Sequence, residues 1–84
     1  MKPKGFFNLQ KMAKFNGYRS WNEWNVSLWI NNDEILYHYS LDLIKRFNLQ
    51  RATKIFMDNL EKTPDGAIYN RSCVYHALKD LKNG

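Results

Sequence analysis

Hydrophobic residues recur every three or four positions over the C-terminal two thirds of the chain, which is the spacing of one helix face. The pattern predicts a helix over residues 35–47, with Asn32 or Asp33 as its cap. A second helix is predicted over residues 50–60, and a closing helix that begins near Asn70 or Ser72. Side chains of alternating charge lie four residues apart on the outer face of the first of these helices, which is typical of an exposed surface: Glu34, His38, Asp42 and Arg46.

The tryptophan-rich stretch after residue 20 fits two kinds of secondary structure. Ser20 and Glu23 have capping-box spacing, in which each side chain accepts a hydrogen bond from the other residue's backbone N–H. Trp21, Trp24 and Leu28 then fall at helical spacing, but the same stretch also alternates between apolar and polar residues as a half-buried strand does. We favour the helix, because of the cap and because the chain offers no partner strand to complete a ladder.

Turn and termination signals complete an all-α prediction. The Pro64-Asp65-Gly66 run predicts a turn before the closing helix, and residues 7–15 fit a short helix near the start of the chain. We therefore predict a small single-domain bundle of about four short helices with a basic N-terminal arm. The expected core consists of Trp24, Leu28, Leu36, Leu43, Ile44, Ile55, Phe56, Leu60, Val74, Leu78 and Leu81.

Charge is unevenly distributed along the 84 residues, which have a formal net charge of +5. Residues 1–22 hold five basic residues and no acidic one, whereas residues 23–84 hold eight of each. We expect a basic arm over residues 1–19 and a helical domain over residues 20–84. Such an arm is attracted to DNA, RNA or an acidic protein surface, and the alternatives are a solubilising terminus or a membrane-surface contact. No apolar run is long enough for a membrane span or a secretory signal.

Candidate chemistry is sparse. His76 follows Cys73 by three residues, but two ligands do not make a structural zinc site, and the single cysteine indicates a reducing cytosol. The acidic residues lie at predicted caps, turns and alternating-charge faces, and no glycine-rich phosphate loop is present. We therefore expect no catalytic residue, no metal, no cofactor and no enzymatic activity.

Three tryptophans lie within nine residues directly after the basic arm. Aromatic rings beside basic side chains suit base stacking and phosphate contacts, whereas tryptophans at helical spacing more often fill a core. They cannot all face one way on a helix, so we expect at least one partly exposed ring to act as an interface anchor. The candidate partner-binding residues are Lys2, Lys4, Lys11, Lys14, Arg19, Trp21, Trp24 and Trp29.

The run WNVSLWINNDE over residues 24–34, followed by Leu36-Tyr37, resembles a family of small uncharacterised proteins encoded by bacteriophages and prophages. The turn Thr63-Pro64-Asp65-Gly66 and Tyr69 match the family's second conserved part, and the resemblance covers about residues 20–81. Ile35 stands where many family members have a glycine, which makes the helix over residues 35–47 more continuous here. The resemblance carries no activity that can be transferred, but it implies a phage accessory protein acting in the cytoplasm of a bacterial host.

Small phage proteins of this size often act by stoichiometric binding, so the leading expectation is an anti-CRISPR-like inhibitor of a bacterial defence protein or nucleoprotein complex. The runner-up is a small nucleic-acid-binding accessory protein that contacts DNA or RNA through the basic arm. A homodimer with a self-complementary tryptophan face is a third interpretation. No membrane partner is expected.

Overall fold

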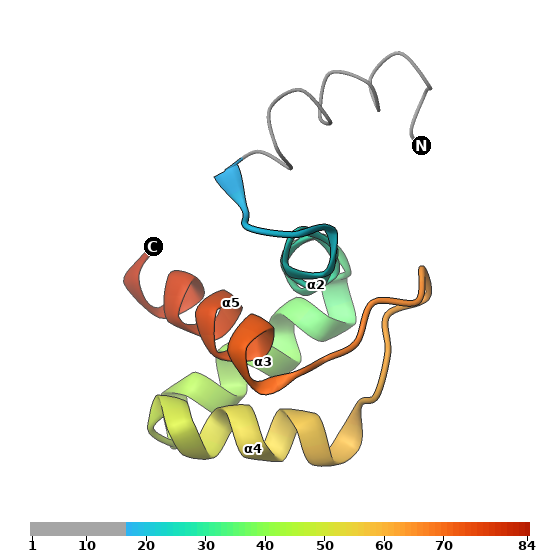
Figure 1. Ribbon diagram of the computed structural model, residues 1–84. Coiled ribbons are helices and arrows are strands. Elements are labelled where there is room, and N and C mark those ends of the chain that lie inside the picture. Colours follow the sequence, from blue (N-terminus) through green and yellow to red (C-terminus); the bar gives the residue numbers. More distant parts are fainter. Residues whose placement is uncertain (1–16) are drawn as a thin grey trace.

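A computed structural model describes residues 17–84, which form four helices (Figure 1). The all-α prediction is confirmed for these residues. The predicted helix over residues 7–15 lies outside them, as do Lys2, Lys4, Lys11 and Lys14. Within the described range, no helix is long and apolar enough to cross a membrane. The helices are α2 (Trp21–Asn32), α3 (Glu34–Arg46), α4 (Leu49–Asn59) and α5 (Arg71–Asn83).

Each helix begins at a side-chain cap. Asp33, Asn48 and Asn70 accept hydrogen bonds from the backbone N–H three residues ahead, at 2.8–3.0 Å. Ser20 does the same for Glu23 at 3.1 Å, so α2 is a helix and the strand alternative is excluded. The reciprocal half of the predicted capping box is wrong, because Glu23 Oε1 accepts from the backbone N–H of Arg19 and not from that of Ser20.

The core is centred on Phe56 of α4, whose ring lies 5.0 Å from that of Tyr69 and 5.8 Å from that of Tyr39, centroid to centroid. Five of the predicted core residues are buried: Trp24, Leu43, Phe56, Val74 and Leu78. The remaining six are only partly buried. Val26 and Ile30 are fully buried members of the core that the sequence analysis missed. Apolar residues occur on every side of α2, so their spacing does not indicate which side faces inward.

A small hairpin over residues 61–69, the 61–69 hairpin, connects α4 to α5. The Gly66 N–H donates to the Thr63 carbonyl at 2.9 Å and closes the predicted turn. Gly66 has a φ of +99°, a conformation that favours glycine. An isolated antiparallel bridge between Lys62 and Ile68 extends the pairing. In Figure 1 this orange segment rises from the end of α4 to the level of α2.

Candidate binding surface

Helix α2 holds the 61–69 hairpin through the side chain of Asn22. The Asn22 Nδ2 donates to the Ile68 carbonyl at 2.9 Å, and its Oδ1 accepts from the Ile68 N–H at 2.7 Å. One amide group thus satisfies both backbone groups of Ile68, as a neighbouring strand would. The backbone of the hairpin is consequently fixed against the first turn of α2.

One turn further along α2, a buried amide anchors the turn of the hairpin. Asn25 is 1% exposed, and its Oδ1 accepts from the Thr63 hydroxyl at 2.7 Å. The Asn25 Nδ2 donates to Asp65 Oδ2 at 2.9 Å, and the same oxygen accepts from the Trp29 indole N–H at 2.9 Å. The Thr63 hydroxyl also accepts from the Ala67 N–H at 3.0 Å. Buried polar groups connected in this way keep the turn in one orientation.

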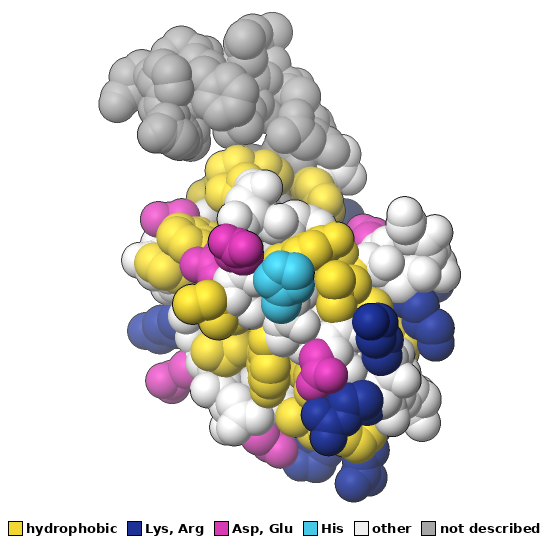
Figure 2. Space-filling model, turned by 180° about the vertical axis from the view of Figure 1, so that it is seen from behind, with side chains coloured by type: hydrophobic (Ala, Val, Ile, Leu, Met, Phe, Trp, Pro, Cys, Tyr) yellow, Lys and Arg dark blue, Asp and Glu magenta, His cyan; other side chains and the backbone are white. Residues whose placement is uncertain are grey.

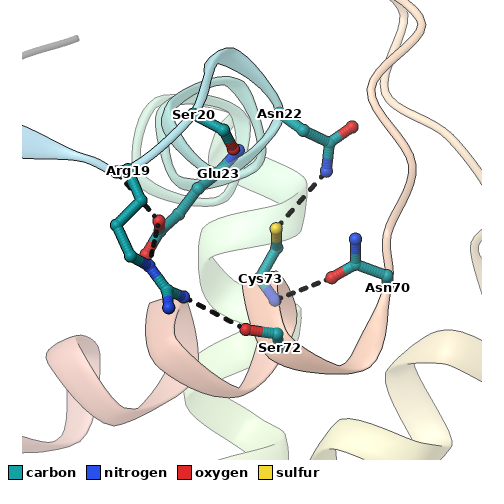
Figure 3. A network of polar contacts seen from close by, with 7 residues as sticks. All are labelled: Arg19, Ser20, Asn22, Glu23, Asn70, Ser72 and Cys73. Carbon is teal, nitrogen blue, oxygen red and sulfur yellow. Dashed lines mark hydrogen bonds and ion pairs between the residues drawn. The ribbon is translucent and has the colours of Figure 1, made fainter. Parts of the chain in front are cut away.

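The first turns of α2 and α5 are joined by a second set of polar contacts (Figure 3). Arg19 Nε donates to Glu23 Oε1 at 3.0 Å, and its Nη2 reaches Ser72 Oγ at 3.2 Å. Asn22 Nδ2 also donates to the sulfur of Cys73 at 3.3 Å. Burial alone would raise the pKa of Glu23, but hydrogen bonds from the side chain and backbone of Arg19 outweigh it and lower the pKa.

Two large hydrophobic side chains remain exposed at the junction of α2 with the hairpin. Trp21 is 37% exposed and Ile68 is 45% exposed. They belong to one junction, because Asn22, the neighbour of Trp21 in the chain, bonds the backbone of Ile68. We call Trp21, Ile68 and the adjacent Arg19 the junction surface. A hydrophobic residue on rigid backbone beside a guanidinium is typical of a protein contact.

The candidate residues from the sequence analysis separate into three groups. Arg19 and Trp21, two residues apart in the chain, are both exposed and belong to the junction surface. Trp24 is 8% exposed, so little of its ring can reach a partner, and Trp29 is half-buried with its indole N–H directed to Asp65. The four lysines lie outside the described residues.

The His and Cys side chains of the described residues do not form a metal site. No three His, Cys, Asp or Glu side chains in residues 17–84 are grouped to hold a metal ion. Cys73 is buried, whereas His76 is exposed. Burial raises the pKa of Tyr69, with a smaller contribution from Asp33.

The residues that build the junction were not among the predicted site residues: Asn22, Asn25 and Ile68. The hydrogen bonds of Asn22 and Asn25 to the hairpin join residues that are 38 to 46 positions apart in the chain. One signal for this site was present in the sequence. Asn22, Asn25 and Trp29 are spaced three and four residues apart, which places their side chains on one face of the helix.

Residues 11–84 match a family model. The chain belongs to DUF7249, a family of unknown function. No curated protein and no solved structure matches the chain. The DUF7249 match includes all four described helices, the 61–69 hairpin and the junction surface.

Proposed function

We propose that this DUF7249 protein is a phage-encoded, non-enzymatic binding protein that inhibits a bacterial defence complex by stoichiometric association, as anti-CRISPR proteins do. The observation that carries the proposal is the junction surface, where Trp21 and Ile68 are exposed on a rigidly held helix and hairpin. Preorganised hydrophobic contacts lose little conformational entropy on binding. The phage origin and the cytoplasm of the host as its location rest on the resemblance of residues 24–37.

Arg19 adds a polar contact to this surface. Its side chain is 68% exposed even while it bonds Glu23 and Ser72. A guanidinium held in place by two protein groups presents its remaining N–H donors in a fixed direction. We infer that the partner offers an apolar pocket for Trp21 or Ile68 with an acceptor, such as a carboxylate or a phosphate, beside it.

The test is a plaque assay on a bacterial strain whose defence system restricts a sensitive phage. Expression of the wild-type protein should restore plaque formation, and Ile68→Lys should abolish the rescue. Truncating a central interface residue weakens binding by about 2 kcal/mol or more, roughly 30-fold. The matched control is Ile35→Lys, which places the same charge at another exposed isoleucine. Equal rescue by the wild type and Ile68→Lys, with both proteins folded and equally expressed, would contradict the proposal.

Nucleic-acid binding through the basic arm is the second candidate. It is favoured by the absence of any acidic residue in residues 1–22, next to the exposed ring of Trp21. Phosphate contacts weaken steeply as salt rises, whereas a packed protein interface changes little. Fluorescence anisotropy with labelled DNA and RNA oligonucleotides at about 50 and about 200 mM salt separates the two candidates. Micromolar affinity at low salt that is lost in the higher salt favours nucleic acid, and no binding at either salt rejects it.

A further inference from the structure

A second exposed hydrophobic site lies between the start of α3 and the end of α4. It is a groove of about 350 Å³ lined by Ile35, Leu36, Tyr39, Asn59 and Leu60. Ile35 is 80% exposed, more than either hydrophobic residue of the junction surface. Asn59 Nδ2 donates to the Tyr39 hydroxyl at 3.0 Å and ties the two helices together along the groove. We call it the α3–α4 groove.

The residues that flank the groove in the chain are acidic. Glu34 precedes Ile35, and Glu61 follows Leu60. The Glu34 side chain is 88% exposed, 4.0 Å from His38, so its charge faces solvent. In addition, no Lys or Arg occurs over residues 20–44, which contain four acidic residues. On the rear face, Lys and Arg lie at mid-height and below, whereas Asp and Glu lie both above them and among them (Figure 2).

The first sixteen residues of the chain have the opposite character. They contain no acidic residue, and basic residues are interspersed with large apolar residues. An apolar groove with acidic residues beside it favours a segment of this composition, because both the hydrophobic contact and the charge attraction are satisfied. The basic residues are Lys2, Lys4, Lys11 and Lys14, and the large apolar ones are Phe6, Phe7, Leu9, Met12 and Phe15.

We propose that the α3–α4 groove binds residues 1–16 of a second copy of this chain. Residues 17–20 precede the first turn of α2, whereas the groove lies beyond the other end of α2, where α3 begins and α4 ends (Figure 1). A second copy can approach this groove directly from solvent, because Ile35 at its edge is 80% exposed. Two copies that exchange segments form two identical contacts in a closed two-fold dimer. Each copy would contribute its first sixteen residues and the residues of its groove to the interface. This number approaches the roughly 20–30 residues per partner of a specific interface.

The test is sedimentation of the full chain at concentrations from about 1 to about 100 µM, at about 50 and about 500 mM salt. We expect a mass rising from 10.1 kDa towards twice that value in low salt, and a weaker dimer in high salt, where charges are screened beyond roughly 3–5 Å. Ile35→Lys should weaken dimerisation at least tenfold, because it adds a like charge at the groove. Ile68→Lys is the matched control and should leave the dimer unchanged.

Charge reversal identifies the occupant of the groove. Lys11→Glu with Lys14→Glu should weaken the dimer, as should Glu34→Lys with Glu61→Lys, and all four changes in one chain should restore it. Circular dichroism confirms that each variant is folded. A monomer at every concentration, a dimer insensitive to Ile35→Lys, or failure of the fourfold variant to recover would overturn the proposal. The inhibitor proposal is independent of these outcomes, because it depends on Ile68 and not on Ile35.

Discussion

The buried hydroxyl of Thr63 offers a sharp test of how the 61–69 hairpin is held. Thr63→Val keeps the branched shape of the side chain but removes the oxygen that donates to Asn25 and accepts from the Ala67 N–H. Asn25 is 1% exposed and Ala67 is fully buried, so water cannot easily replace either bond. An unsatisfied buried polar group costs about 1–3 kcal/mol. Two of them should lower the free energy of unfolding by roughly 2–6 kcal/mol.

Ser40 provides the matched control because it is also a buried hydroxyl. In the described part of the chain its Oγ is the one buried side-chain oxygen or nitrogen without a hydrogen-bond partner. Ser40→Ala removes this unpaired group and places a better helix former in α3, so the free energy of unfolding should stay unchanged or rise by up to about 1 kcal/mol. The two variants therefore delete the same kind of atom with opposite expected effects.

Urea denaturation followed by circular dichroism measures both variants, and the slope against urea should be the same as for the wild type. A loss of 2 kcal/mol corresponds to a melting temperature lower by about 8–16 °C in a domain of this size. A double-mutant cycle with Asn25→Ala should give a coupling of about 0.5–3 kcal/mol. If Thr63→Val and Ser40→Ala both lie within about 0.5 kcal/mol of the wild type, the hydrogen-bond network does not stabilise the hairpin and our reasoning is refuted.

Two further predictions concern the caps and turns of the same region. The lowered pKa of Glu23 means that this carboxyl binds a proton less readily in the folded protein than in the unfolded chain, so its stabilising effect is present above the unfolded pKa and is lost as the pH falls through the folded pKa. The difference in stability between the wild type and Glu23→Gln should therefore shrink as the pH falls from about 6 to about 3. Urea titrations at several pH values measure this difference, and a constant difference would contradict the prediction. The methyl group of Gly66→Ala would meet no neighbouring atom, but residue 66 must keep a φ of +99°. Thermal melting should therefore show a free energy of unfolding lower by about 1–2 kcal/mol. An unchanged melting temperature would show that the turn tolerates a side chain.

The helices were predictable from the sequence because their signals are local. Ser20 and Asp33 lie three residues from the N–H groups that they cap, and the apolar face of α4 recurs at regular spacing. The orientation of α2 was not predictable in this way. Val26 and Ile30 face the core while Trp24, on another side of the helix, is also buried, so the usual contrast between an inner and an outer face is missing.

The junction surface could not be predicted because it depends on pairing between distant segments. Asn22 looks like an ordinary polar helix residue until Ile68, 46 residues later, is placed beside it. The turn chemistry of residues 63–66 was visible in the sequence, but nothing local indicated that Asp65 would meet Asn25 and Trp29. The candidate tryptophans were consequently identified as a group, and only the structure separates exposed Trp21 from the other two.

Helix α2 uses different sides for stability and for recognition, and the hairpin connects the two. Val26 and Ile30 pack into the core, whereas Asn22 and Asn25 hold a segment that has little regular structure of its own. A short hairpin without a larger sheet is marginally stable by itself, so the position of Ile68 relative to Trp21 depends on these amide contacts. The hydrogen bonds that complete the fold therefore also fix the geometry of the exposed surface. This explains why a small domain can present a rigid hydrophobic contact on a connection between helices, where a free loop would lose more conformational entropy on binding.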